Sequence, residues 1–243
     1  AILISNPGNP TGVIYTEQEM ALISRIVRKH DLALIADEVY REFVYDGEYK
    51  SFGTMPELAE HLIMIDSVSK RYSACGARIG CVMTKNKELS AQLLKCCQAR
   101  LSVSQLDQAG ATGLYTTPAS YWEEVRNEYT RRRDTLKEAL SAMPGVISSE
   151  PKGAFYVMVK LPVDNIEKFA QWLLTDFAID NETVMITPGN GFYVSSPDRG
   201  RDECRIAYVL NCEDLKKAMH ILAEGLKQYP AVSYTHLTLP TIA

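Results

Sequence analysis

The sequence predicts an α/β fold, with a partial, mostly parallel sheet in a large first domain and a smaller C-terminal α+β domain. Short apolar runs such as Leu32–Ala36 and Leu62–Ile65 end in polar residues. Such runs are typical of strands buried on both faces of a parallel sheet. Helical patterns alternate with these runs, as α/β layering requires. The 243 residues suffice for one large or two modest domains.

The first domain is expected to cover residues 1–118 and to open with a strand at residues 1–5, followed by a turn-rich loop. Thr16 and Glu19 have the spacing of a capping box, which predicts a helix over Glu17–His30. The same domain should contain three further elements: a helix near 57–61, a strand at 79–83 and a helix over 86–101.

A long helix over residues 119–144 is expected to join the domains, because Ser120 and Glu123 form a second capping box. The small domain should then span residues 145–230. It should contain a strand at 154–161, an amphipathic helix behind a cap at Asp164, a strand at 204–210 and a last helix capped by Asn211.

Both ends of the chain are unusual. It begins without Met on a predicted strand, so we expect additional sequence upstream. Residues 231–243 follow neither a helical nor a strand period and resemble an adapter read through in frame. We interpret them as a non-native tail, with a disordered natural tail as the alternative.

Composition excludes several classes of protein. The net charge of −4 offers no basic field for a nucleic acid, and the apolar runs are far shorter than the roughly 20 residues of a membrane span. Six cysteines without C-x-x-C spacing and four scattered histidines indicate neither a disulfide framework nor a metal site. We therefore expect a cytoplasmic protein with reduced thiols, no metal, no nucleic acid and no membrane partner.

Polar residues follow the predicted strands at the sheet edge where ligands bind in α/β proteins. Each has an ordinary explanation by itself, such as a turn, a cap or a surface charge. Their convergence is more specific, because it places an amine, a carboxylate, hydroxyls and a guanidinium at one edge. The candidates are Asn9, Asp37, Tyr40, Ser67, Ser69, Lys70 and Arg78.

Three motifs carry a resemblance to a known family. They are Asn-Pro-x-x-Pro-Thr-Gly at residues 6–12, Asp37-x-x-Tyr40, and Ser67-x-Ser-Lys70-x-Tyr-x-x-x-Gly-x-Arg78-x-Gly80. Their order and spacing resemble those of the class I/II aminotransferases of fold type I, in particular the bacterial aspartate aminotransferase-like enzymes. The resemblance continues through residues 152–155 and 204–207 and reaches about Tyr229.

The resemblance implies a role for each candidate. Lys70 would attach pyridoxal 5'-phosphate and move the proton, and Asp37 would pair with the ring nitrogen so that the ring accepts electrons. Asn9 and Tyr40 would bind the phenolic oxygen, with Tyr40 counted among the catalytic residues. Ser67, Ser69 and Arg78 would hold the phosphate. Arg205, with Asn9, would bind the substrate.

The implied activity is transfer of an α-amino group, with aspartate as the expected donor, to a 2-oxo acid such as 2-oxoglutarate. A homodimer is implied for the full-length protein, as are upstream residues that complete the phosphate site. The alternatives are a carbon–sulfur lyase or decarboxylase of the same fold, or a non-catalytic remnant. Ser67-Val-Ser-Lys70 also matches the S-x-x-K motif of serine acyl enzymes, but the S-D-N and K-T-G strings that accompany it are missing.

Overall fold

The computed structural model describes residues 1–196 and 198–230. The chain divides into two compact units. Of the described residues, unit 1 comprises 1–9, 13–126 and 152–154, and unit 2 comprises 10–12, 127–151, 155–196 and 198–230. The tail proposed at 231–243 lies outside the described residues.

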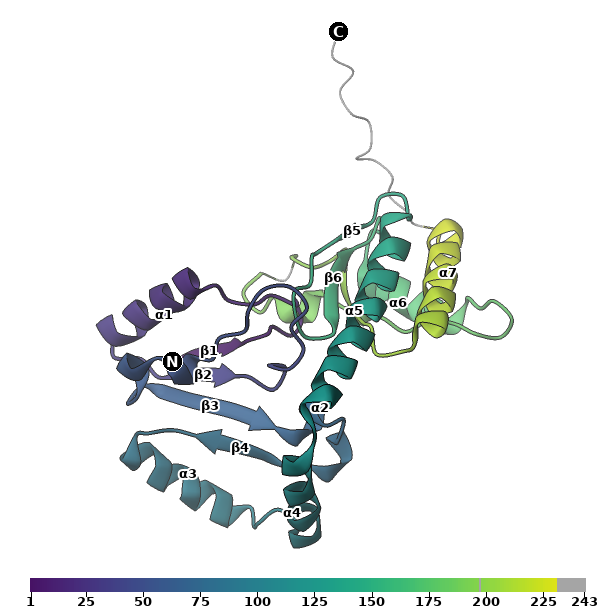
Figure 1. Cartoon of the computed structure of the whole chain (residues 1–243). Coiled ribbons are helices and arrows are strands. Elements are labelled where there is room, and N and C mark those ends of the chain that lie inside the picture. Colours follow the sequence, from purple (N-terminus) through teal and green to yellow (C-terminus); the bar gives the residue numbers. More distant parts are fainter. Residues whose placement is uncertain (197, 231–243) are drawn as a thin grey trace. The chain divides into compact units, whose positions relative to one another are not determined.

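Unit 1 is built on a mixed, mostly parallel sheet, as predicted (Figure 1). Its strands lie in the order β1 (Ile2–Ser5), β2 (Leu34–Asp37), β3 (Leu62–Ser67) and β4 (Gly80–Met83). The first three are parallel to one another, and β4 pairs with β3 in the antiparallel direction. The carboxyl ends of β1, β2 and β3 therefore meet at one edge.

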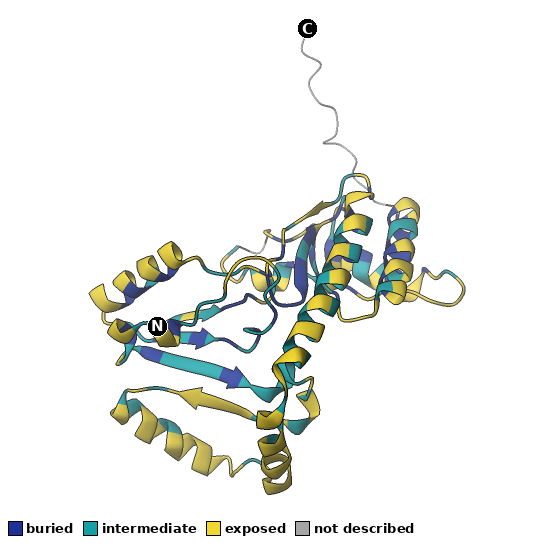
Figure 2. Cartoon of the chain, viewed as in Figure 1, coloured by how far each residue is buried: buried dark blue, intermediate teal, exposed yellow. Residues whose placement is uncertain are grey.

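Helix α1 (Glu17–Lys29) covers the hydrophobic core of unit 1. The predicted capping box is present, because Thr16 accepts from the Glu19 amide and Glu19 accepts from the Thr16 amide. In place of the helix predicted near 57–61, the chain forms two short 3₁₀ turns, η1 (Phe52–Thr54) and η2 (Pro56–Leu58). The buried core residues, dark blue in Figure 2, include Met20, Val27, Leu34, Ala36, Phe52, Leu58 and Leu62.

The remaining elements of unit 1 follow β3 along the chain. They are α2 (Val68–Arg71), η3 (Cys75–Ala77), α3 (Lys87–Ala99), α4 (Gln105–Thr112) and η4 (Gly113–Thr116). Helix α3 agrees with the prediction over 86–101, whereas α4 was not predicted. None of the residues of β4, α3 and α4 is buried, in contrast to β2 (Figure 2).

Helix α5 (Ala119–Ser141) is the long helix expected at 119–144, and the division between the units falls within it, after Arg126. The capping box predicted at Ser120 is wrong. Ser120 already lies inside the helix, and a side chain caps a helix only from the residue before its first turn.

Unit 2 contains an antiparallel sheet packed with helices. The strand order is β5 (Ile147–Ser148), β6 (Tyr156–Lys160), β8 (Glu203–Ala207) and β7 (Thr187–Pro188). Its other elements are α6 (Ile166–Thr175), η5 (Asn190–Phe192) and α7 (Cys212–Gln228). Buried residues at its centre include Leu136, Leu140, Val157, Val159, Phe169, Leu173, Tyr208, Leu215 and Leu222.

The two caps predicted for unit 2 have different outcomes. Asn211 caps α7 as predicted, since its side chain accepts from the Asp214 amide. The cap predicted at Asp164 is wrong, because α6 is capped one residue later. The Asn165 side chain accepts from the amides of Glu167 and Lys168, while Asp164 accepts from the Tyr229 hydroxyl at 3.2 Å.

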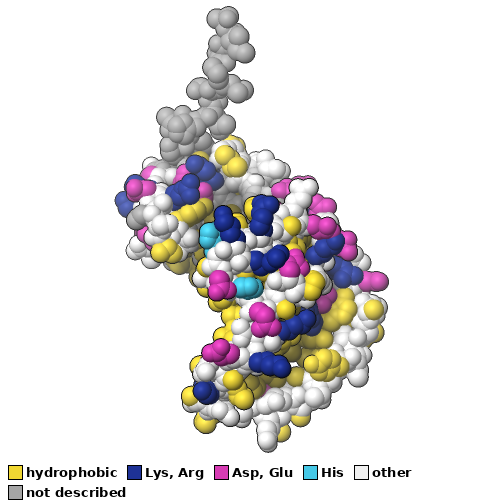
Figure 3. Space-filling view, turned by 90° about the vertical axis from the view of Figure 1, so that its left-hand side faces the viewer, with side chains coloured by type: hydrophobic (Ala, Val, Ile, Leu, Met, Phe, Trp, Pro, Cys, Tyr) yellow, Lys and Arg dark blue, Asp and Glu magenta, His cyan; other side chains and the backbone are white. Residues whose placement is uncertain are grey.

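Acidic and basic side chains are interspersed on the face drawn in Figure 3, in line with the small net charge. Among the helices of the described residues, none has both the length and the apolar character needed to cross a bilayer.

Candidate active site

The candidate residues of unit 1 gather where the parallel strands end. Ser5, Asp37 and Ile65 are aligned in register across β1, β2 and β3. Asn9 lies in the loop that follows β1, Asp37 is the last residue of β2, and Lys70 lies on the turn of helix that follows β3. The sheet topology thus places the three motifs on one edge, as the sequence predicts.

Lys70 lies on α2, a single helical turn whose start is fixed by Ser67. The Ser67 Oγ accepts a hydrogen bond from the Ser69 amide at 2.9 Å. The Lys70 Nζ lies 6.0 Å from the centre of the buried Tyr40 ring and 3.8 Å from the Cys75 Sγ. Two of the predicted catalytic residues, Lys70 and Tyr40, are therefore neighbours.

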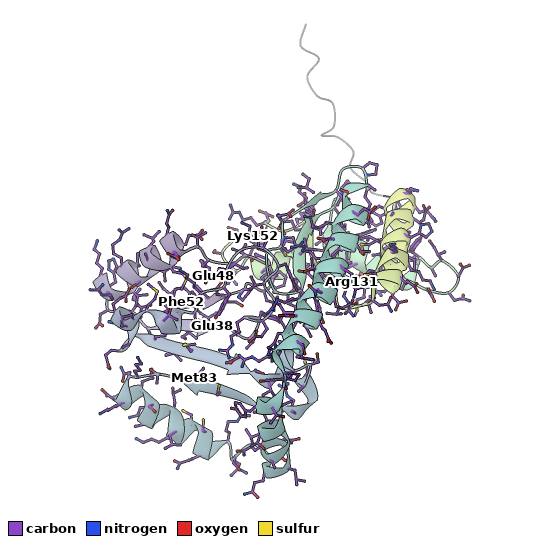
Figure 4. All side chains as sticks on the ribbon, viewed as in Figure 1. Glu38, Glu48, Phe52, Met83, Arg131 and Lys152 are labelled. Atoms are coloured by element: carbon purple, nitrogen blue, oxygen red, sulfur yellow. The ribbon has the colours of Figure 1, made fainter. Side chains whose placement is uncertain are left out.

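The adjacent carboxylates Asp37 and Glu38 differ in environment. Glu38 is fully buried. It accepts hydrogen bonds from the Tyr49 hydroxyl, from the Ser51 hydroxyl at 2.7 Å and from the Phe52 amide at 2.9 Å. Glu38 and Phe52 are labelled in Figure 4. Asp37 is half-buried, and its Oδ1 accepts from the Val39 amide at 3.2 Å. Glu38 is therefore a structural acceptor, and Asp37 is the carboxylate at the site edge.

Burial, followed by the charge of Glu38, raises the pKa of Tyr49. The Tyr49 hydroxyl consequently keeps its proton and remains a donor to Glu38. This contact ties the loop after residue 45 to the end of β2, directly beside Asp37.

The segment from Ser67, the last residue of β3, to the start of β4 carries the three residues predicted to bind the phosphate. The Ser67 Oγ donates to the Ile79 carbonyl at 3.0 Å, so its proton is engaged within the loop. Arg78 is exposed in a left-handed conformation with φ of 53°, and its Nη1 donates to the Cys75 carbonyl at 2.9 Å. A Cβ at Gly80 would lie 3.0 Å from the Asp66 carbonyl oxygen, a tight contact, so glycine favours the close approach of β4 to β3.

The first motif also divides into a structural and an exposed part. Asn6 is fully buried, and its side chain accepts from the Tyr15 amide at 3.1 Å and donates to the Lys50 carbonyl at 3.2 Å. Asn9 is exposed in the loop that follows. Asn6 thus holds the loop that presents Asn9.

An ion cluster beside Lys70 was missed by the sequence reasoning. The Asp66 Oδ2 lies 2.6 Å from the Arg71 Nη2 and 3.1 Å from the Arg41 Nη2. Its Oδ1 accepts from the Ser67 amide at 2.8 Å. Glu42 joins the cluster through Arg71 at 3.5 Å. One feature of the sequence could have indicated this cluster. Asp66 is an acidic residue at the end of an apolar run, directly before the lysine motif.

Burial is the main influence on Asp66. It raises the pKa of that carboxyl, against the opposing effects of the Ser67 amide and the Arg41 charge, and the nearby Asp37 adds to the increase. The charge of Asp37, at the end of β2, therefore acts on the Asp66 carboxyl near the end of the neighbouring strand β3.

Arg205 belongs to unit 2, where it lies in the middle of β8 opposite Met158 and Thr187. Its guanidinium carbon lies 4.5 Å from the Tyr156 ring centre and 5.6 Å from that of Phe192. The Arg205 Nη2 is 3.5 Å from the Thr187 Oγ1. Aromatic faces of unit 2 thus orient this cation.

A hollow of about 340 Å³ lies near the amino ends of β2 and β3 and is lined by none of the candidate residues. Asp31, His61 and Asn86 are among its lining residues. Within the described ranges, no three His, Cys, Asp or Glu side chains are grouped so that they could hold a metal ion.

The donor set at the strand ends of unit 1 fits a phosphorylated pyridine aldehyde. It offers an amine at Lys70 for the aldehyde and a carboxylate at Asp37 for a protonated ring nitrogen. Arg78 offers a planar guanidinium for an oxyanion, because its contact with Cys75 uses one of five N–H donors.

Comparison with known proteins agrees with this chemistry. The family model for aminotransferase class I and II matches residues 1–222. The aspartate aminotransferase of Bacillus subtilis strain 168 is 29% identical over 238 residues, which cover 94% of this chain and 58% of that protein. The chain therefore spans a little over half the length of this relative.

Solved structures give the same result. The aspartate aminotransferase of Thermus thermophilus with maleate superposes with a TM-score of 0.80 at 27% identity, over 92% of this chain and 56% of that one. The aromatic aminotransferase of Pyrococcus horikoshii gives a TM-score of 0.77 at 30% identity, over 93% and 59%. The fold is that of the fold type I aminotransferases, as predicted.

Proposed function

The chain belongs to the class I and II aminotransferases, and from this premise we propose that the full-length protein is a pyridoxal 5'-phosphate-dependent transaminase. It would transfer the α-amino group of an amino acid, with aspartate as the expected donor, to a 2-oxo acid such as 2-oxoglutarate. The observation that supports this best is the placement of the Lys70 amine and the Asp37 carboxylate after adjacent parallel strands.

The cofactor, when bound, supplies an aldehyde for covalent attachment and a ring that accepts electrons from the substrate α-carbon. Lys70 is the residue that would attach it and would then carry the proton to and from the α-carbon. The amine can accept a proton only when it is uncharged. The neighbouring Tyr40 ring limits the directions in which the Lys70 side chain can extend.

Asp37 would hold the proton on the ring nitrogen. A carboxylate beside the ring nitrogen would favour its protonated form, because an opposite charge nearby stabilises the cation. Its position at the end of β2, with Oδ1 bonded to the Val39 amide, restricts the rotation of the side chain. Tyr40 and Asn9 would donate hydrogen bonds to the phenolic oxygen of the ring.

Ser69 and Arg78 would bind the phosphate group, together with Ser67. Ser67 can donate to a phosphate only if it exchanges its present bond to the Ile79 carbonyl. Arg205 of unit 2 would bind the substrate α-carboxylate, with Asn9 as a second substrate contact. The proximity of the Tyr156 and Phe192 rings to the Arg205 guanidinium supports this role, because they limit its orientations.

The names of the relatives bear on the substrate class. Relatives are aspartate, aspartate/prephenate and aromatic aminotransferases, and the Thermus thermophilus structure contains maleate, a dicarboxylate. A dicarboxylic amino acid is therefore the first donor to examine. We also propose that the full-length protein is a homodimer; exposed apolar side chains in unit 1, such as Leu106 and Tyr115, offer surface for such contacts.

Borohydride reduction of the full-length protein loaded with pyridoxal 5'-phosphate tests the proposal. We expect the reduced adduct on the peptide that contains Lys70, and no adduct in Lys70→Ala. Lys95→Ala, which changes an exposed lysine on α3, should retain the adduct. An adduct at another lysine would contradict the assignment.

A donor screen with 2-oxoglutarate then distinguishes the reaction types. A transaminase needs the acceptor for turnover, whereas a lyase releases ammonia without it and a decarboxylase releases carbon dioxide. A protein that binds no cofactor would be a non-catalytic remnant.

A further inference from the structure

We propose that Arg71 is a positioning residue for Lys70, and that its ion pair with Asp66 holds the lysine-bearing turn in the conformation the reaction needs. The inference rests on the proposed function for its consequence in catalysis. Its structural basis is the cluster of Asp66, Arg71, Arg41 and Glu42 around the end of β3.

The pair spans the turn from one end to the other. Asp66 precedes α2, and its Oδ1 accepts from the Ser67 amide at 2.8 Å. Its Oδ2 binds the Arg71 Nη2 at 2.6 Å, from the last residue of α2. A single carboxylate therefore contacts the main chain where the turn begins and the side chain where it ends.

The turn needs such a contact because it is short. A helix of four residues has almost no internal hydrogen bonds to stabilise it, and isolated helical turns are unfavourable in water. The Ser67 cap and the Tyr72 amide bond to the Val68 carbonyl close the backbone. The Arg71–Asp66 pair adds a side-chain constraint that those backbone bonds do not supply.

The constraint determines where Lys70 points. Neighbouring residues on a helix are rotated by about 100° about its axis. When Arg71 is held on Asp66, Lys70 must extend to a different side of the turn. That side contains the Tyr40 ring, 6.0 Å from the Lys70 Nζ.

The pair is protected from solvent. The side chains of Arg71 and Asp66 are 16% and 10% exposed. Removal of one partner would leave the other charge poorly solvated, so a partly buried pair constrains its surroundings more than a surface pair does. The exposed Lys227–Glu224 pair on α7, with Lys227 64% exposed, lacks this property.

The chain contains a matched control. Arg41 binds the same Asp66 oxygen at 3.1 Å, but it lies after β2 and not on the lysine turn. Arg41→Gln and Arg71→Gln remove the same charge from the same carboxylate. If Arg71 positions Lys70, only Arg71→Gln should disturb Lys70. If the loss of charge beside Asp66 alone matters, Arg71→Gln and Arg41→Gln should disturb Lys70 to a similar extent.

The test uses the full-length protein with Arg71→Gln, Arg71→Lys and Arg41→Gln. Hydrogen exchange of the amides of residues 68–72 reports the turn directly and needs no cofactor. We expect exchange there to rise by tenfold or more in Arg71→Gln and by less than threefold in Arg41→Gln, while the amides of β1 and β2 keep their rates. Arg71→Lys should give an intermediate increase.

The functional readout is the rate at which added pyridoxal 5'-phosphate becomes trapped on Lys70 by borohydride. We expect this rate to fall by about tenfold in Arg71→Gln, and by less than twofold in Arg41→Gln. In transamination assays, Arg71→Gln should lower kcat more than it changes KM for the amino donor. The conservative Arg71→Lys should recover part of the loss.

Equal effects of the two Gln variants, or unchanged exchange in Arg71→Gln, would overturn the proposal. So would a general rise in exchange throughout unit 1, since that would indicate lost stability and not lost position. If exchange changes as expected but the wild-type protein traps no cofactor on Lys70, the proposed function fails while the positioning of Lys70 by Arg71 stands.

Discussion

Lys70 and Arg71 are neighbouring cations with separate surroundings, and the difference arises from single contacts. Arg71 is bound by a carboxylate, whereas Lys70 extends toward Tyr40 and Cys75. The neighbouring acids Asp37 and Glu38 also differ in their surroundings. Three donors bind Glu38 inside unit 1, whereas Asp37 lies at the site edge. In both pairs, one charge supports the structure and the other remains at the site edge.

The carboxylate of Asp37 should be essential for turnover and dispensable for folding. Asp37→Asn keeps the shape but cannot hold a proton on the ring nitrogen. We expect kcat of the full-length protein to fall on the order of a hundredfold or more, the scale of a lost proton-transfer contribution, with little change in cofactor affinity. Asp31→Asn, an exposed aspartate before β2, is the control. Unchanged kcat in Asp37→Asn would contradict the assignment.

Cys204 should be chemically inert in the folded chain. Burial, followed by the charge of Glu203, raises the pKa of its thiol to about 12. Only the thiolate is a nucleophile. We therefore expect iodoacetamide at pH 8 to modify the exposed Cys75 and to leave Cys204 unmodified until denaturant is added, as peptide mapping would show.

The raised pKa of Cys204 also predicts that the folded chain loses stability at alkaline pH. The folded chain holds the Cys204 proton more tightly than the unfolded chain, whose thiol has an ordinary pKa of 9.0. The contribution to stability is thus complete below pH 9 and is lost progressively toward pH 12. Cys204→Ala should reduce the slope of unfolding free energy against pH in this range. An identical slope would count against a buried neutral thiol.

Much of the candidate site could be predicted at the level of residues, because motif spacing already orders Asn9, Asp37, Lys70 and Arg78 along the strand ends. The Asp66–Arg71 pair could not. Its members are five positions apart, beyond the spacing of helical neighbours, and they meet only because the chain turns sharply after β3.

At the scale of elements, the helix caps show what short sequence patterns can and cannot predict. Thr16 and Asn211 cap α1 and α7 as predicted. The caps predicted at Ser120 and Asp164 fail by one or two positions, although a helix follows in both places. Several capping residues stand together at such boundaries, and tertiary contacts decide which one is used; Asp164, for example, binds Tyr229.

The capping box of α1 should stabilise unit 1 measurably. Thr16→Ala removes the acceptor for the Glu19 amide, and we expect a loss of about 0.5–2 kcal/mol in the free energy of unfolding. The exposed Gln18→Ala, in the same first turn, is the control. Thermal or denaturant unfolding of the full-length protein measures both. Equal effects of the two changes would show that the box contributes nothing specific.

The stabilisation that the capping box gives to α1 should also decrease in acid. The amide of Thr16, followed by its hydroxyl, lowers the pKa of the exposed Glu19 carboxyl. A lowered pKa means that the contribution is present above the ordinary pKa and is lost as the pH falls through the folded value. The difference in stability between wild type and Thr16→Ala should therefore shrink as the pH falls below 4.5. A constant difference would contradict this contribution of Glu19.

At the scale of the whole molecule, the two units have different surfaces. In unit 2 the helices and the sheet bury many apolar side chains, among them Leu140, Phe169 and Leu222. In unit 1 the outer strands β1 and β4 carry exposed apolar residues, and so do the segments after α3. The alternating pattern predicted the mostly parallel sheet of unit 1, but it could not predict which faces of that unit lack cover, because coverage depends on long-range packing.

The uncovered surface predicts the behaviour of this chain by itself. Leu3 on β1 is 71% exposed and Val82 on β4 is 49% exposed, and both strands are outer strands of the described sheet. Leu101, Leu106 and Tyr115 are 78%, 86% and 88% exposed. Outer strands with exposed apolar side chains pair readily with other chains.

We therefore expect residues 1–230, expressed alone, to aggregate and to show negligible transamination, whereas the full-length protein should be a monodisperse dimer. Light scattering after size-exclusion chromatography measures both states. Introducing charge on the outer strands, with Leu3→Lys and Val82→Lys together, should reduce aggregation of the short chain, because lysine disfavours edge pairing. The exposed Lys95→Leu on α3 should not reduce it. A monodisperse short chain with robust specific activity would show that unit 1 needs no further cover.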